Sequence, residues 1–309
     1  MKKLILLFCA LGIALSSWAY DFTANGIYYN ITDAKTVAVT YATTSYNSYS
    51  GAVSIPDSVT NAATGIKYSV DSIGNNAFNG CLSLTAITIA SSVTSIGNYA
   101  FSSCLGLAAI AIPSSVTAIG NGAFFACANL KSIPIPSSLT ALGSYVFANC
   151  TTLVSITIPS SITSIGNEAF ENCTGLADIY AYPTTPVGLA YSSYAFYNVD
   201  TTKCTLHVPS GSLDAYKEAN VWKGFTNISN DLNTTTGKTE VATSAVKVTV
   251  INGQAVITGA EAGTTLNIYN LQGLAIYTGK TSGEPQNIPL PAHGVYIVQL
   301  GGKSVKVIY

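Results

Sequence analysis

The 309-residue sequence contains no arginine, and only 9% of its residues are charged. All 13 basic residues are lysines, and with 14 acidic residues they give a formal net charge of −1 at neutral pH. Proteins that bind nucleic acids carry a basic stripe or patch that contacts phosphates, and no segment of this sequence provides one. We therefore predict that nucleic acid is not a partner and that hydroxyl and amide groups supply most of the polar surface.

Residues that carry catalysis are also scarce. The two histidines, His207 and His293, fall in different predicted domains, and the acidic residues are scattered without paired spacing. No phosphate-binding loop, calcium loop or nucleophile elbow is present. A strand position for His207 favours a structural role. The sequence predicts no catalytic residues, no metal site and no cofactor, so the protein is not expected to be an enzyme.

Long apolar runs are absent beyond the first residues. Lys2 and Lys3 precede an apolar run, and Ser17-Trp18-Ala19 follows it, which is typical of a secretory signal peptide over residues 1–19. No later run approaches the ~18–20 apolar residues of a membrane helix. We expect an exported protein with no membrane span in the mature chain.

What the sequence does contain is repetition, because one 23-residue unit recurs five times over residues 69–183. Four residue types recur at fixed offsets: Phe78, Phe101, Phe124, Phe147 and Phe170; Cys81, Cys104, Cys127, Cys150 and Cys173; Gly74, Gly97, Gly120, Gly143 and Gly166; Leu84, Leu107, Leu130, Leu153 and Leu176. A period of this length is the signature of a solenoid, in which each unit forms one coil and stacks on its neighbours.

The pattern inside one copy predicts how a coil is built. Ile110 and Ile112 alternate with alanines, as in a half-buried strand, and stacking would place such strands in parallel about 4.8 Å apart. Residues 121–127 predict a short helical turn with Phe124 and Cys127 facing inward. Pro134 is the only proline inside such a strand, so the ladder should lack one hydrogen bond there.

The regular cysteines allow two functional interpretations, disulfides and metal binding. An exported protein permits disulfides, and equivalent residues on adjacent coils lie within reach of a bridge. Five stacked thiols that point the same way cannot all pair, however, and zinc sites usually contain closely spaced cysteines or histidines. We expect at least five free, buried thiols, with Cys204 also buried.

The five copies of L-x-x-I-x-I, the fifth with Ala181 at the last position, are usually followed by P-S-S-[VLI]-T-x-[IL]-G-N-x-A-F-x-x-C and resemble the BspA-like type of leucine-rich repeat. This type occurs on secreted and surface proteins of Gram-negative anaerobes. The resemblance implies a mainly β leucine-rich-repeat solenoid, secreted or displayed on the outer surface of a Gram-negative bacterium. It also implies adhesion, through binding to an extracellular protein or glycan.

The flanking segments predict caps and a second domain. Residues 20–68 form an N-terminal cap with a partial repeat, residues 184–230 a C-terminal cap, and residues 231–244 a linker. Residues 245–309 contain six or seven short strands with glycine-rich turns, which favours a small β-sandwich. Segments 268–273 and 290–296 resemble the C-terminal sorting domain of type IX secretion substrates.

Candidate ligand-binding residues come from the C-terminal end of the repeats, where large outward side chains replace small ones. They are Asp178, Tyr180, Tyr182, Tyr191 and Tyr194. These tyrosines either cover the apolar edge of the last coil or form a contact patch for a protein or a sugar. Two other functions stay open, namely a passive structural surface protein without a specific ligand and, less in keeping with the sequence, a glycan-acting enzyme.

Overall fold

The computed structural model describes residues 19–42, 46–189, 193–232, 246–251, 254–270, 275–290, 295–301 and 303–308. The predicted signal peptide lies outside the described residues except for Ala19, as does the predicted linker apart from residues 231 and 232. The described chain is mainly β, with one short helix, α1 (Leu213–Glu218), and one 3-10 turn, Trp222–Gly224. In this part of the chain, no helix has the length and apolar character needed to cross a membrane.

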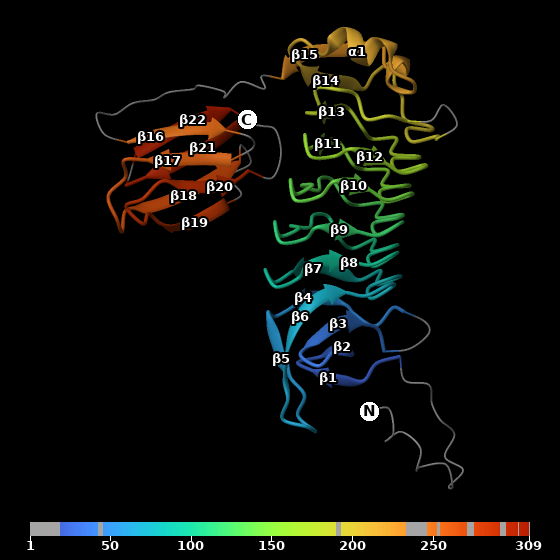
Figure 1. Cartoon of the computed structure of the whole chain (residues 1–309), viewed down its shortest axis with the longest axis vertical. Coiled ribbons are helices and arrows are strands. Elements are labelled where there is room, and N and C mark those ends of the chain that lie inside the picture. The colour runs from blue at the N-terminus through green and yellow to red at the C-terminus, as the bar shows by residue number, and fades with distance from the viewer. Residues whose placement is uncertain are drawn as a thin grey trace.

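The repeats form a stack of coils, confirming the predicted solenoid (Figure 1). Each coil has two strand positions. One holds β8 (Ser95–Ile96), β9 (Ala118–Ile119), β10 (Ala141–Leu142) and β12 (Ser164–Ile165), and the other holds β7 (Leu84–Thr88), β11 (Ser155–Ile158) and β13 (Asp178–Ala181). Neighbouring strands that pair are parallel and keep the 23-residue offset, as Ser95 with Ala118 and Ser155 with Asp178 show.

The segment expected to be a helical turn consists of hydrogen-bonded turns instead. In residues 120–127 the backbone bonds run from one residue to the third before it, as from Cys127 to Phe124. Positive φ angles at Gly122 (60°) and Ala126 (55°) interrupt any helix. Amide groups of this segment bond to the next coil, for example from Phe124 to Val146. Stacking between coils therefore holds a backbone shape that L-residues rarely adopt.

The repeated phenylalanines form a continuous column in the core. Successive rings from Phe78 to Phe170 are stacked, with centroids 5.0 to 5.7 Å apart. All five side chains are fully buried, as are the five repeated cysteines. Tyr49 covers the first ring of the column, and Phe196 and Trp222 continue it at the other end.

A second column sits where glycine and asparagine follow each other. The side-chain oxygen of Asn75 accepts a bond from the Asn98 amide, and that of Asn98 from the Asn121 amide, each at 2.7 Å. A Cβ added to Gly97 would lie 2.6 Å from the backbone nitrogen of Asn75 in the preceding coil, and a Cβ on Gly120 would lie 2.6 Å from that of Asn98. The repeated glycine is thus required by close approach between coils.

Both ends of the stack are closed by further sheet. At the N-terminal end, β1 (Phe22–Ala24), β2 (Ile27–Asp33) and β3 (Thr36–Thr40) are antiparallel, and β3 pairs with β6 (Lys67–Ile73). Next to them, β4 (Gly51–Ser54) pairs with β7, and β5 (Ser58–Thr60) with β6. At the other end, β14 (Thr205–Pro209) and β15 (Asn227–Leu232) extend the sheet of β11 and β13, and α1 lies beside them (Figure 1).

The C-terminal segment forms two antiparallel sheets. One contains β16 (Lys247–Ile251), β17 (Gln254–Thr258) and β20 (Gln286–Pro289). The other contains β18 (Thr265–Asn270), β19 (Ala275–Lys280), β21 (Val295–Leu300) and β22 (Lys303–Ile308). Residues from both sheets, including Ile257 and Val298, share one apolar core. This arrangement agrees with the predicted strands, whereas a role as a sorting domain stays a prediction.

The sheets of the solenoid are interrupted between its third and fourth copies. β9 ends the sheet that begins in the N-terminal cap, and β10 pairs only with β12. On the other strand position, the copies with Ala111 and Pro134 form no strand and are joined by a single bridge, between Ala109 and Ser132. Pro134 has no amide to donate, and the other copy is rich in alanine, which is depleted in strands.

Candidate binding site at the C-terminal end of the repeats

Strand register brings two of the predicted residues onto one sheet face. β13, β14 and β15 are parallel neighbours, and Tyr180 is aligned with His207. The imidazole of His207 lies flat on the ring of Tyr180, with centroids 4.5 Å apart and planes 14° from parallel. Side chains at these outward positions therefore form a layer over three adjacent strands.

His207 joins two carboxylates that are far apart in the sequence. Its Nε2 atom lies 3.1 Å from the Asp178 carboxylate, and its Nδ1 atom lies 2.9 Å from both oxygens of Asp231. An ionised carboxylate only accepts hydrogen bonds, so both contacts are hydrogen bonds when the ring carries two protons. The three residues tie β13, β14 and β15 together across their exposed face.

The electrostatics of this face follow from burial and from the two acids. Burial raises the pKa of Tyr180, and the charges of Asp178 and Asp231 raise it further. Among the described residues, no group of three or more potential ligands is arranged to hold a metal ion. The arrangement can orient a ligand through carboxylate oxygens and ring edges. Among the residues that the structure describes, no serine, threonine or cysteine is bonded to His207 as a nucleophile would be.

Tyr194 belongs to a different part of the surface, on the turns. The Glu168 amide donates to the carbonyl of Ser193, and Glu168 and Tyr194 both have a positive φ, of 56° and 50°. Tyr194 therefore continues the column of turns and not the strands. Tyr194 and Tyr197 contact each other at right angles, with centroids 5.8 Å apart. Their side chains are 56% and 52% exposed, among the most exposed large apolar groups described.

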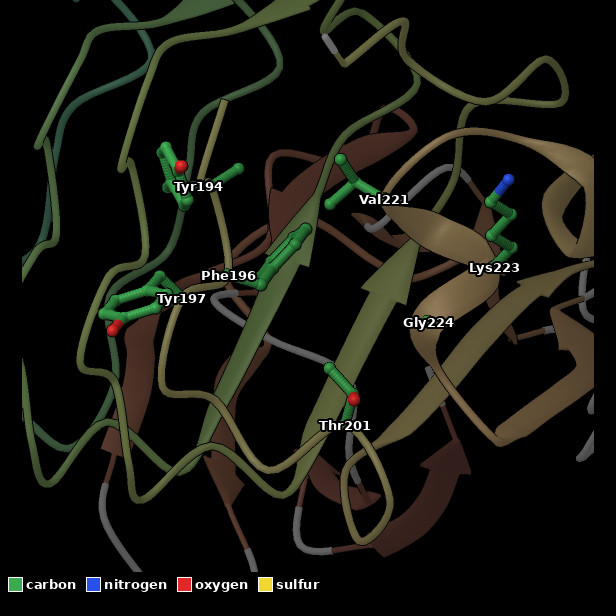
Figure 2. A pocket seen from close by; sticks show the side chains of 8 residues that line it. Tyr194, Phe196, Tyr197, Thr201, Val221, Lys223 and Gly224 are labelled. Carbon is green, nitrogen blue, oxygen red and sulfur yellow. The ribbon is translucent and has the colours of Figure 1, made fainter. Parts of the chain in front are cut away.

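A hollow of about 290 Å³ lies beside these two tyrosines. Figure 2 shows Tyr194 and Tyr197 on one side, Val221 and Lys223 on the other, and Phe196 between them. Its remaining lining residues are Ala195, Thr201 and Gly224. Val221 has a φ of 70°, an outlier for a β-branched residue and a form of strain that proteins retain mainly at functional positions.

Three of the five predicted site residues therefore fall into two separate groups, and the other two belong to neither. Asp178 and Tyr180 lie on the strand face with His207 and Asp231, while Tyr194 lines the hollow with Tyr197. Tyr182 is half-buried directly after β13, and Tyr191 lies outside the described residues. The sequence did not indicate His207 or Asp231 as part of a site. The one signal in the sequence was that His207 is a polar residue at an outward strand position of the C-terminal cap.

Comparisons with known proteins agree with the repeat architecture. Residues 58–177 match the model of the BspA type leucine rich repeat region in six copies, so the match extends into the partial repeat before residue 69. None of the curated proteins matches the chain.

Three solved structures illustrate the similarity. A leucine-rich repeat protein of T. pallidum is 27% identical, over 66% of this chain and 93% of that one, with a TM-score of 0.47. A leucine-rich repeat protein from Bacteroides ovatus is 23% identical, over 69% and 68%, with a TM-score of 0.34. The pneumococcal vaccine antigen PcpA is 16% identical, over 69% and 70%, with a TM-score of 0.44.

Proposed function

We propose that this chain is an exported cell-surface binding protein, which uses its repeat stack to present a contact site for an extracellular protein or glycan. The observation that carries the proposal is the pair of exposed tyrosines, Tyr194 and Tyr197, beside a hollow at the end of the stack. Aromatic side chains are enriched where proteins bind partners, because they supply large contact areas on rigid groups.

The rest of the molecule supports a scaffold with a local site. The outward strand positions of the first copies hold small or neutral residues, such as Ala86, Ala109 and Ser132. At these strand positions, large outward groups such as Tyr180 and His207 lie near the last coil and the C-terminal cap. A family match to BspA type repeats is consistent with a binding role and with display at the cell surface.

Binding to an array of glycans and matrix proteins tests this proposal. The chain from Tyr20 onward should bind at least one component saturably, and the Tyr194→Ala, Tyr197→Ala double variant should weaken that binding at least tenfold. Tyr99→Ala serves as the matched control, because Tyr99 is an exposed turn tyrosine of an earlier coil. Absence of saturable binding to every component would favour a passive structural protein instead.

A further inference from the structure

The turns at the C-terminal end of the stack carry both tyrosines and a ladder of asparagines. We propose that these turns bind an uncharged, extended β-1,4-linked glycan, whose sugar rings follow one another along the stack from Tyr145 to Tyr194. This inference rests on the proposed binding function and names the class of ligand for it. It also extends the site from the hollow beside Tyr194 and Tyr197 onto the preceding coils.

Tyr145, Glu168 and Tyr194 occupy equivalent places on three successive turns of the stack. The Tyr145 amide donates to the carbonyl of Asn167 in the next coil. The Glu168 amide donates in the same way to the carbonyl of Ser193. The three residues have φ angles of 59°, 56° and 50°, so the same backbone shape repeats at each of them. Tyr145 and Tyr194 are therefore two coils apart on one side of the stack, with Glu168 between them.

The two-coil spacing matches the repeat of a β-1,4-linked chain. Parallel strands of adjacent coils lie about 4.8 Å apart. In the turn segments themselves, the buried rings of Phe147, Phe170 and Phe196 have centroids 5.6 and 5.3 Å apart. An extended β-1,4-linked chain advances by a similar distance per sugar ring and presents the same face at every second ring. Two such rings can therefore pack equivalent C–H faces against Tyr145 and Tyr194.

A ladder of asparagine side chains runs along the same turns. The side-chain amide of Asn172 donates to the side-chain oxygen of Asn149 at 2.9 Å, and that of Asn198 to Asn172 at 2.7 Å. An amide NH2 group has two hydrogens and the ladder uses one, so the second can donate to a sugar hydroxyl. At this place the three earlier coils hold Gly80, Ser103 and Ala126. The ladder thus begins at the coil of Tyr145.

The charges of the turns favour an uncharged glycan. The turn segments contain no lysine, and their only charged residues are Glu168 and Glu171. These segments are 75–81, 98–104, 121–127, 144–150, 167–173 and 193–198. The Tyr145 hydroxyl donates to the Glu168 carboxylate at 3.2 Å, and that carboxylate has further lone pairs for sugar hydroxyls. A glycan that carries carboxylates or sulfates would be repelled here, whereas an uncharged one meets both acceptors and amide donors.

Oligosaccharides of equal length but different linkage test the inference by isothermal titration calorimetry. The probes are cellotetraose and tetra-N-acetylchitotetraose, which are β-1,4-linked, and maltotetraose, which is α-1,4-linked and curved. At least one β-linked tetraose should bind about tenfold more tightly than maltotetraose and than its own disaccharide, which reaches only one of the two tyrosines. Binding of cellotetraose alone would assign the site to glucose chains, and binding of the chitotetraose alone to N-acetylglucosamine chains.

Variants locate the site on these turns. Tyr145→Ala should weaken tetraose binding about tenfold, and Tyr145→Phe should retain most of the affinity because the ring remains. Asn198→Gly removes one amide of the ladder, tolerates the φ of 61° at this position and should also weaken binding. Tyr99→Ala is the matched control and should leave binding unchanged, because Tyr99 stands at the equivalent place of an earlier coil without the ladder. Unchanged melting temperatures establish that each variant is folded.

The outcomes distinguish this inference from the broader proposal. Equal affinity for β-linked and α-linked tetraoses, or a preference that survives in Tyr145→Ala, overturns the inference, as does an equal loss in Tyr99→Ala. Binding of a protein or of another glycan, if lost in the Tyr194→Ala, Tyr197→Ala double variant but retained in Tyr145→Ala, overturns it while the proposed binding function stands. A chain that binds nothing saturably overturns both.

Discussion

The thiol of Cys127 donates a hydrogen bond of 3.0 Å to the carbonyl oxygen of Phe101, one coil earlier in the stack. The same bond recurs from Cys104, Cys150 and Cys173, at 3.1, 3.2 and 3.1 Å. The six cysteines within the described residues are free and buried. The repeated cysteine therefore fills space beside the phenylalanine column and also links adjacent coils, which explains its regular spacing without disulfides or metal.

Free thiols can be counted directly. The chain without residues 1–19, denatured in the absence of reductant, should titrate six thiols with a chromogenic thiol reagent. The native chain should react with close to none over the same period, because every one of these cysteines is buried. A denatured count near zero would mean that the cysteines form disulfides.

Stability should fall in alkaline solution. Burial raises the pKa of Cys127 to about 12, against an ordinary value of 9.0, and raises that of Cys173 similarly. Since the folded value exceeds the unfolded one, the stabilisation is complete below pH 9 and is lost as the pH rises from 9 towards 12. Each such thiol should lower the free energy of unfolding by about 1.4 kcal/mol per pH unit over that range.

Urea melts at pH 8, 9 and 10 with reductant present measure this slope. Buried tyrosines such as Tyr29, whose pKa burial also raises to about 12, contribute to it. Comparison with Cys127→Ala isolates the contribution of one thiol, because the free energy of unfolding of that variant should depend less steeply on pH. Identical slopes for the two proteins would contradict the prediction.

The phenylalanine column should dominate the stability of the stack. Phe101→Ala leaves a cavity between two stacked rings, and we expect it to lower the free energy of unfolding by about 3–5 kcal/mol. Phe125→Ala, at a half-buried turn position against Tyr99, is the matched control and should have less than half that effect. If both variants lost a similar amount of free energy of unfolding, the phenylalanine column would not be the main source of stability.

Pro134 should weaken the strand ladder. Pro134→Thr restores an amide donor and a residue that favours strands, so we expect the free energy of unfolding to rise by about 0.5–1.5 kcal/mol. Thr157, at the equivalent position of β11, supplies the reverse control, since Thr157→Pro should destabilise. An unchanged or lowered urea midpoint for Pro134→Thr would contradict the proposed register.

The contact between His207 and Asp231 should be measurable as a coupling between two residues. A double-mutant cycle with His207→Gln and Asp231→Asn should give about 0.5–1 kcal/mol, at the low end of charged pairs because the Asp231 side chain is half exposed. Raising the salt concentration should reduce the coupling. A second cycle that combines His207→Gln with Asp214→Asn supplies the control. An equal coupling in that cycle would exclude a specific contact between His207 and Asp231.

The repeat architecture could be predicted because the same side chains recur at the same offset. Five copies of Phe and Cys must occupy equivalent places in equivalent coils, so their burial followed from the period alone. The turn geometry could not be predicted in this way. Positive φ angles occur at Tyr99, Tyr145 and Glu168, although these residue types do not predict them. Backbone hydrogen bonds between coils stabilise this conformation.

The candidate site was only partly visible in the sequence. Asp178 pairs with Thr205, at an offset of 27 instead of 23, because extra residues separate the last coil from the cap. The alignment of His207 with Tyr180, and the approach of Asp231, depend on that shift in spacing. Tyr194 is near Asp178 in sequence but lies on the turns. Each coil has a strand side and a turn side, and residues about half a period apart in the sequence lie on different sides.

The interruption of both sheets between β9 and β10 also determines how the stack would respond to tension along its length. Elsewhere neighbouring coils share ladder bonds of paired strands. Here the connection depends on the isolated 3.2 Å bond from the Val154 amide to the Lys131 carbonyl, on turn contacts such as the 2.9 Å bond from Phe124 to Val146, and on the buried column. Tension applied to the two ends would therefore separate the solenoid into two blocks at this junction before either block unfolds. A protein anchored at one end and bound to a ligand at the other would extend there first, leaving the cap that carries the tyrosines and the hollow intact.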